Sequence, residues 1–333
     1  MSVEFIPCGI LGTGSYVPEQ VLTNRDLEQI VETTDEWIVT RTGIRERRIC
    51  APDQATSDLS VESARRALEA SGLKPDQIDM IICCTFTADH TCPSTACLIQ
   101  RRLGIRREVP AFDLAAACSG FIYGCSVAAG LIRTGTCKHV LVIGTDAMSK
   151  ILDFEDRNTC VLFGDGSGAA VLGPVEPGRG LLGQCLGADG DGADYIIVPA
   201  GGSREPVTET TLQERRQYIQ MAGNEVFKFA SRVLGKAVRH ALSDSGDRLS
   251  PSELDLIIPH QANIRIIESA SKKLGVPMDR FVVNIDRYGN TSAGTVPIAL
   301  DEAVREGRLK RGHLFALVAF GGGLTYAASI WRW

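Results

Sequence analysis

Three residues with reactive or hydrogen-bonding side chains lie at related places in two similar half-chains. Cys118 in AAACSGF and Asn290 in YGNTSAG each lie between an apolar strand-like segment and an apolar helix-like segment. These two residues are 172 positions apart, and so are Gly135 and Gly307, which end the two helical segments. Such an internal repeat indicates two copies of one structural unit. His260 in PHQANIRII follows an apolar strand of the second copy, so we expect one shared site that combines a nucleophile with polar partners.

Each of the three residues also has a purely structural alternative. The small residues around Cys118 let the chain turn sharply into a helix, whose first N–H groups favour a thiolate. A buried core cysteine is the alternative, and it suits most of the other ten cysteines of the chain. His260 would otherwise be a polar residue at a helix start, and Asn290 an ordinary N-cap. The equivalence of Asn290 to Cys118 favours the shared site.

A glycine-rich turn, Phe320–Gly323, follows the last long apolar strand. Consecutive glycines let the backbone pass close to a bound group and direct an N–H at it, as an oxyanion hole requires. A flexible linker is the alternative, but apolar segments lie on both sides of the turn. The glycine-rich FGDGSGAA at 163–170 lacks the ending of a phosphate loop, and we interpret it as a tight turn.

Composition excludes several classes of function. A net charge of −5 disfavours nucleic-acid binding, and the longest apolar runs are too short to span a bilayer. The N-terminus has no basic region of the kind that begins a signal peptide. Eleven cysteines without a CxxC pair fit a reducing cytosol and argue against a disulfide framework or a metal site. No linker divides the 333 residues, so we expect two closely packed halves, residues 1–175 and 176–333.

Strands and helices are expected to alternate, which implies largely parallel sheets flanked by helices, with the site at the strand carboxyl ends. Helices are predicted for Ser57–Gly72 (with Ser57 as the N-cap), Pro93–Gly104, Ser119–Gly135, Asn224–Ser245, Asn263–Gly275 and Ser292–Gly307. Strands are predicted for Asp79–Thr85, Val109–Leu114, Val140–Gly144, Ala169–Leu172, Leu256–Ile258, Phe281–Asn284 and Phe315–Phe320.

AAACSGF, PHQANIRI, YGNTSAG and AFGGGLTY, in this order, closely resemble the signature segments of β-ketoacyl-acyl carrier protein synthase III, of the thiolase superfamily. TTDEWIVTRTGIRERRI and MAGNEVFKFA resemble the family too, so the likeness covers almost the whole chain. It implies a duplicated α/β fold in which two thiolase-like halves form a five-layer αβαβα sandwich. It also implies a cytoplasmic homodimer without a cofactor or metal, which uses acyl-CoA and acyl carrier protein and contacts neither nucleic acid nor membrane.

The resemblance implies a decarboxylative condensation that initiates fatty acid synthesis. Cys118 would accept an acyl group from acyl-CoA, with the N–H groups of Cys118 and Gly322 forming the oxyanion hole. His260 and Asn290 would then stabilise the enolate that malonyl-acyl carrier protein forms on losing CO₂. A related acyltransferase or condensing enzyme of secondary metabolism, or an acyl-binding relative without the reaction, remains the alternative.

Further residues are assigned by position in the family's motifs. The CoA-binding set is Thr33, Trp37, Arg41, Arg157, Gly223, Phe227 and Asn263. The docking set for acyl carrier protein is Lys228, Arg265, Lys272 and Lys273. Cys92 replaces a bulky aromatic residue that, in the family, often reaches across the dimer interface to cap the partner's acyl pocket. We therefore expect a roomier acyl pocket, unless Phe86 or Leu152 fills the space.

Overall fold

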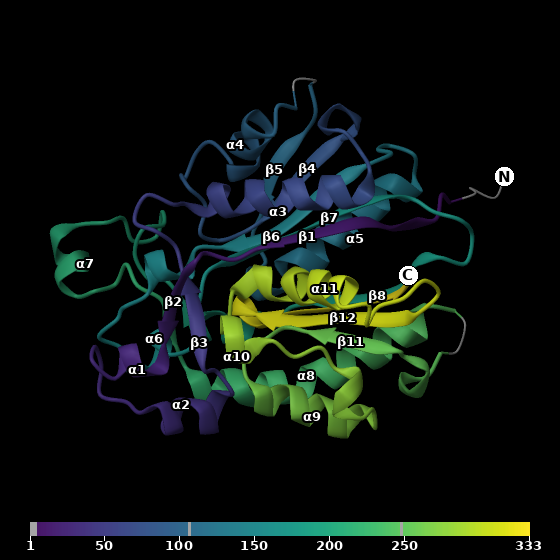
Figure 1. The fold of residues 1–333 in the computed structure, drawn as a ribbon. Helices are drawn as coiled ribbons and strands as arrows, with labels where there is room; N and C mark the ends of the chain where they lie inside the picture. Colours follow the sequence, from purple (N-terminus) through teal and green to yellow (C-terminus); the bar gives the residue numbers. More distant parts are fainter. Residues whose placement is uncertain (1–4, 106–107, 247–248) are drawn as a thin grey trace.

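The computed structural model describes residues 5–105, 108–246 and 249–333, and it contains two main sheets, one in each half of the chain (Figure 1). The first sheet has the strand order β1-β7-β6-β4-β5, and the second has the order β11-β12-β13-β8. The strands of the first sheet are β1 (Cys8–Tyr16), β4 (Met80–Cys84), β5 (Ala111–Leu114), β6 (Val140–Asp146) and β7 (Gly166–Pro174). Those of the second are β8 (Gly180–Gly187), β11 (Leu256–Pro259), β12 (Leu314–Gly321) and β13 (Thr325–Arg332).

Helices cover both sheets and fill the space between them, which gives the expected five layers, αβαβα (Figure 1). The helix α3 (Thr56–Ser71) packs on the outer face of the first sheet, and α8 (Gly223–Asp244) with α9 (Ile264–Leu274) lies on the outer side of the second. The central layer consists of α5 (Gly120–Arg133) and α11 (Thr295–Arg305), which contact both sheets. Burial from two sides explains why these central helices are rich in alanine, glycine and aliphatic residues.

The other strands and helices are short. The small strands are β2 (Gln20–Thr23), β3 (Glu46–Ile49), β9 (Ile196–Ile197) and β10 (Gln220–Met221). The remaining helices are α1 (Asn24–Leu27), α2 (Asp35–Thr42), α4 (Thr95–Arg102), α6 (Arg157–Cys160), α7 (Glu209–Gln213) and α10 (Ile285–Tyr288). Two short 3₁₀ segments, η2 (Ala117–Ser119) and η7 (Ser292–Gly294), precede α5 and α11. Among the described helices, none combines the length and the apolar character needed to cross a bilayer.

The expectation of largely parallel sheets is wrong, because β7 pairs antiparallel with β1 and β6, and β13 pairs antiparallel with β12 and β8. Two local predictions are wrong as well. Phe281–Asn284 is not a strand, because only Phe281 forms a bridge to Ile257 before the chain enters α10. Its apolar residues are buried all the same, and burial alone made the segment resemble a strand. Ser57 is not an N-cap, since α3 begins at Thr56 and Ala55 takes the N-cap position, where its N–H donates to the Asp58 carboxylate at 2.7 Å.

Candidate active site

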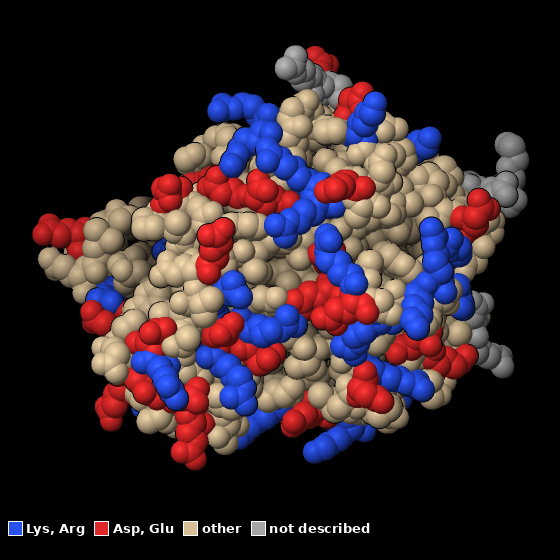
Figure 2. All heavy atoms as spheres, viewed as in Figure 1, with Lys and Arg blue, Asp and Glu red and all other residues tan. Residues whose placement is uncertain are grey.

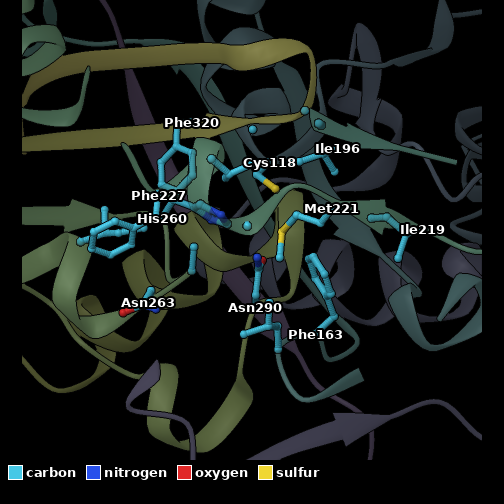
Figure 3. Close-up of a pocket in the computed structure, with 18 of the residues that line it drawn as sticks. Cys118, Phe163, Ile196, Ile219, Met221, Phe227, His260, Asn263, Asn290 and Phe320 are labelled. Atoms are coloured by element: carbon cyan, nitrogen blue, oxygen red, sulfur yellow. The ribbon is translucent and has the colours of Figure 1, made fainter. Parts of the chain in front are cut away.

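One cavity of about 90 Å³ lies where the two halves meet, and Cys118, His260 and Asn290 all line it. Figure 3 shows the three side chains approaching this cavity from different segments of the chain. Gly322, the expected second donor of the oxyanion hole, lines it as well. Cys118 and Asn290, the two residues that the repeat made equivalent, therefore line the same cavity, although 172 positions separate them in the sequence.

Cys118 lies in η2, directly before α5, and only 8% of its surface is exposed. A Cβ atom on Gly321 would lie 2.7 Å from the backbone nitrogen of Cys118, so the FGGG turn passes the nucleophile at a distance that requires glycine. Burial raises the pKa of the Cys118 thiol to about 12, although the Ser292 hydroxyl, 3.5 Å from Sγ, acts in the opposite direction. The start of α5 also favours the thiolate. Burial outweighs both effects, so the resting site holds a thiol and not the thiolate that its place before a helix suggested.

His260 follows β11 and is held on three sides. Its backbone N–H donates to the Val318 carbonyl at 2.8 Å, and its Nδ1 lies 2.6 Å from the Thr295 hydroxyl. The edge of the ring meets Phe320 with centroids 5.1 Å apart. Burial lowers the pKa of His260 to about 3, because the charged imidazolium would be desolvated. The ring is therefore neutral at physiological pH, and Nε2 is the nitrogen left for a substrate.

Asn290 has one side of its amide already engaged. Its Oδ1 accepts a hydrogen bond from the Ser292 N–H at 2.8 Å, and its backbone N–H donates to the Leu162 carbonyl at 2.8 Å. Because the amide oxygen is used within the turn, the NH₂ group is the part that can donate to a ligand. Asn290 thus offers a neutral donor beside a thiol, and the neutral His260 offers a second one in the tautomer whose Nδ1 accepts from the Thr295 hydroxyl.

The expected CoA-binding residues form a band between the surface and this cavity. Gly223, Phe227 and Asn263 line the cavity itself. Asn263 Nδ2 donates to the backbone carbonyl of Arg41 at 2.9 Å, which ties the cavity mouth to α2.

Two guanidinium groups stack on one indole at the outer end of this band. The Cζ atoms of Arg41 and Arg157 lie 4.7 Å and 5.1 Å from the Trp37 ring centroid. Nearby in the sequence, Thr33 Oγ1 is buried without a hydrogen-bond partner among the described residues. An aromatic face with cations on it suits a planar, negatively charged nucleotide.

The expected docking residues lie on two helices that pack together, α8 and α9. Three of them have local partners: Lys228 pairs with Glu225, Lys273 Nζ donates to the Ser231 carbonyl, and Arg265 donates to the Thr40 carbonyl. On the face seen in Figure 2, lysines and arginines lie beside acidic side chains and do not form one continuous basic surface.

Cys92 is exposed and does not line the cavity of its own chain. Several residues that do line it were not anticipated: Leu162, Phe163, Ile196, Ile219 and Met221. Phe86, which we considered as a possible filler of the pocket, does line the cavity. Ser292 belongs to the YGNTSAG motif, but its proximity to Cys118 needed the structure.

A cysteine at the start of a central helix, facing a neutral histidine and an asparagine from the other half of a five-layer fold, defines a thiolase-like condensing enzyme. Two family models match the chain: 3-oxoacyl-[acyl-carrier-protein] synthase III over residues 112–190 and the C-terminal part of the same synthase over residues 245–333. The β-ketoacyl-[acyl-carrier-protein] synthase III of Caldanaerobacter subterraneus is 54% identical, over 99% of both chains. The corresponding synthase of Desulfitobacterium hafniense is 52% identical over 98% of both.

Solved structures agree with this assignment. The synthase III of Aquifex aeolicus matches with a TM-score of 0.89 and 44% identity, covering 98% of this chain and 100% of that one. The enzyme of Thermus thermophilus matches with a TM-score of 0.89 and 45% identity, covering 98% and 99%. This chain belongs to the β-ketoacyl-acyl carrier protein synthase III family. The expectations of an acyltransferase and of an initiating condensing enzyme of fatty acid synthesis are confirmed.

Proposed function

We propose that the chain condenses an acyl-CoA primer with malonyl-acyl carrier protein through an acyl-Cys118 intermediate, with no cofactor. In the first half-reaction the Cys118 sulfur attacks the thioester carbonyl, and CoA leaves. The negative charge on the carbonyl oxygen is held by the N–H groups of Cys118 and Gly322. The close approach of the FGGG turn to Cys118 supports this pairing of donors.

In the second half-reaction malonyl-acyl carrier protein loses CO₂ and leaves an enolate on its thioester oxygen. His260 and Asn290 donate hydrogen bonds to that oxygen. Both are neutral, and the Asn290 amide is already oriented by the Ser292 N–H. Preorganised donors in a buried site stabilise such a charge far more strongly than donors in water do. The enolate carbon then attacks the acyl-Cys118 carbonyl and releases 3-ketoacyl-acyl carrier protein.

Substrates would reach Cys118 along the band that runs from Trp37 through Asn263. The Trp37–Arg41–Arg157 cluster would hold the nucleotide end of CoA, while Thr33, Gly223, Phe227 and Asn263 would line the rest of its path. Acyl carrier protein would dock on α8 and α9 at Lys228, Arg265, Lys272 and Lys273. We also propose that the protein is a homodimer and that it works in the cytoplasm. The eleven free cysteines favour such a reducing compartment.

The observation that carries the proposal is the meeting of Cys118, His260 and Asn290 in one buried cavity. The test supplies acetyl-CoA and malonyl-acyl carrier protein and follows CO₂ release together with acetoacetyl-acyl carrier protein. Formation of both products in equal amounts is expected. Acyl binding without CO₂ release would indicate a non-condensing relative, and transfer of the acyl group to another acceptor would indicate a related acyltransferase.

A further inference from the structure

A fully buried carboxylate lies behind the catalytic turn, at the end of β6. Oδ1 of Asp146 is bonded by the Thr85 hydroxyl at 2.8 Å, by the Phe86 and Thr87 N–H groups at 3.0 and 3.2 Å, and by the Thr87 hydroxyl at 2.9 Å. Its Oδ2 accepts from the Ala293 N–H at 3.2 Å. No lysine or arginine in the described part of the chain forms an ion pair with it, so only neutral donors hold its charge. Burying a charge this way is costly, and a group kept at that cost beside a nucleophile is a candidate for function.

Ser292 stands between this carboxylate and the nucleophile. Its Oγ lies 3.5 Å from Cys118 Sγ, and the N–H of the next residue, Ala293, donates to Asp146 Oδ2 at 3.2 Å. The Ser292 hydroxyl also acts on Asp146, since it lowers the carboxyl pKa that burial raises. The residue is completely buried and adopts a φ of +51°, a left-handed backbone conformation that costs a serine about 1–2 kcal/mol. Strain at a buried polar residue that touches the reacting atom points to a role in the reaction.

Acylation needs an acceptor for the thiol proton, and the surrounding groups leave few choices. The titratable groups that face Asp146 and Cys118 are Cys83 and Cys84 of β4 and His260 after β11. Burial raises the pKa of both β4 thiols, so they stay protonated. Burial makes the imidazolium form of His260 unfavourable. Asp146 is the remaining base, and burial raises its pKa above the ordinary carboxyl value, which makes it a better proton acceptor.

We propose that Ser292 and Asp146 form a proton relay for Cys118. This proposal rests on the proposed acyl-Cys118 intermediate. As the sulfur attacks the acyl-CoA carbonyl, the thiol proton passes to Ser292 Oγ, and the Ser292 hydroxyl proton passes to the Asp146 carboxylate. CoA leaves as a thiolate and is protonated by solvent. When the enolate attacks the acyl group, the Cys118 thiolate is released and takes the proton back from Asp146 through Ser292.

The relay never leaves two negative charges in the buried site while the sulfur attacks. Before acylation that charge is on Asp146, where it opposes the formation of a thiolate at Cys118. When the proton moves, the charge moves to the sulfur and then to the carbonyl oxygen in the oxyanion hole. No second charge has to be desolvated, and the repulsion between Asp146 and the thiolate disappears at the moment the thiolate forms.

The test measures the rate at which acetyl-CoA acylates Cys118, by rapid quench and intact-protein mass, from pH 6 to pH 9. The wild-type rate is expected to be nearly level with pH, because the relay removes the proton as the sulfur attacks. Ser292→Gly, which suits the left-handed backbone, and Asp146→Asn should slow acylation at pH 7 by about a hundredfold, in the range typical of general base catalysis. Their rates should rise about tenfold for each pH unit, because only preformed thiolate then reacts.

Asp301→Asn is the matched control. Asp301 is a buried carboxylate on α11 that accepts from the hydroxyls of Thr13 and Ser15 at 2.9 and 2.7 Å, yet it does not line the cavity. Its variant should keep the level pH profile, and CoA should bind to all three variants as it does to wild type. Level profiles and wild-type rates in Ser292→Gly and Asp146→Asn would overturn the relay.

The relay and the proposed function fail in different ways. If acetyl-CoA does not acylate Cys118 in the wild type, the proposed function fails. Alkylation of Cys118 by iodoacetamide, which needs the same proton to leave, still tests the relay in that case. A level profile in the wild type and a rising one in Ser292→Gly would support it, and identical profiles would overturn it.

Discussion

The turn that carries Cys118 and the turn that carries Asn290 occupy equivalent positions in the two halves but serve different chemistry. Each is entered through a residue with positive φ, +47° at Ala117 and +61° at Gly289. Cys118 then leads at once into a helix, which places its sulfur and its own N–H at the helix start. After Asn290 the chain makes one further 3₁₀ turn, and the Ser292 N–H in that turn fixes the Asn290 amide. One backbone plan thus places a buried thiol at a helix start in one half and orients an amide NH₂ group in the other.

The rest of the repeat shows which features this plan needs. The central helices end at equivalent residues, Arg133 and Arg305. Asp79 and Asp255 have the same structural role. The Asp79 carboxylate accepts from the His139 N–H directly before β6, and the Asp255 carboxylate accepts from the Leu314 N–H at the start of β12. The edge strand β5, however, has no counterpart beyond a single bridge among the described residues of the second half. Strand, turn and central helix occur in both halves, whereas the edge strand occurs in one.

The largest expected effect separates the two turns by function. Cys118→Ala should abolish acylation and condensation while CoA still binds. Asn290→Ala or His260→Ala should slow decarboxylation by about a hundred- to a thousandfold, because one enolate donor is lost, yet Cys118 should still accept an acyl group. Intact-protein mass after exposure to acetyl-CoA and CO₂ release from malonyl-acyl carrier protein measure the two half-reactions. Normal decarboxylation by the Asn290 variant would contradict its assignment.

Substitution should change the free energy of unfolding much more at Gly289 than at Ala117. Gly289 has φ +61° and ψ −153°, a region open essentially to glycine, and a Cβ there would lie 2.9 Å from the Leu162 carbonyl oxygen. Gly289→Ala should therefore lower the free energy of unfolding by about 3 kcal/mol or more. Ala117→Gly relieves a left-handed alanine and should change it by less than about 1 kcal/mol. Urea unfolding measures both; equal losses would show that the turns are not built alike.

The repeat explains how much of the molecule the sequence predicts. Cys118 and Asn290 could be singled out because motif and spacing mark them independently, whereas His260 is marked by its motif and its place after a strand. The apolar run of β6 is long enough to identify a buried strand. Phe281–Asn284 was misassigned because burial by packing leaves the same pattern as burial in a sheet. The Ser292–Asp146 contact could not be inferred, since it joins residues 146 positions apart through a backbone conformation that serine rarely adopts.

The pH dependence of stability should show whether His260 is buried in its neutral form. The pKa of His260 is about 3 in the folded chain and about 6.5 when unfolded, so the unfolded state binds the extra proton between these values. Stability is therefore present above pH 6.5 and is lost as pH falls, by about 1.4 kcal/mol per unit. Between pH 7 and pH 5 the wild type should lose about 2 kcal/mol more than His260→Gln. Parallel losses in chemical denaturation would show that His260 is not buried in its neutral form.

A smaller effect is expected at the surface of α9. Arg265→Glu should raise KM for malonyl-acyl carrier protein about tenfold and leave acylation by acetyl-CoA almost unchanged, because only the docking of an acidic partner is weakened. Added salt should narrow the difference, since the Debye length falls from about 10 Å at 0.1 M to about 3 Å at 1 M. Arg65→Glu, on the exposed side of α3, is the control. Equal losses in both half-reactions would place Arg265 in the fold and not in docking.

The smallest expected effect concerns Cys92, which lies outside the cavity of its own chain. If it caps the partner's acyl pocket in a homodimer, its small side chain leaves room for longer primers, and each buried CH₂ adds about 0.8 kcal/mol to binding. Phe86, already in the cavity wall, limits that room from within the same chain. Cys92→Phe should lower kcat/KM for octanoyl-CoA several-fold and spare acetyl-CoA, whereas Cys97→Phe, at the neighbouring exposed cysteine, should change neither. A wild type confined to acetyl-CoA, or identical chain-length profiles in the wild type and Cys92→Phe, would show that Phe86 and its neighbours alone limit the primer length.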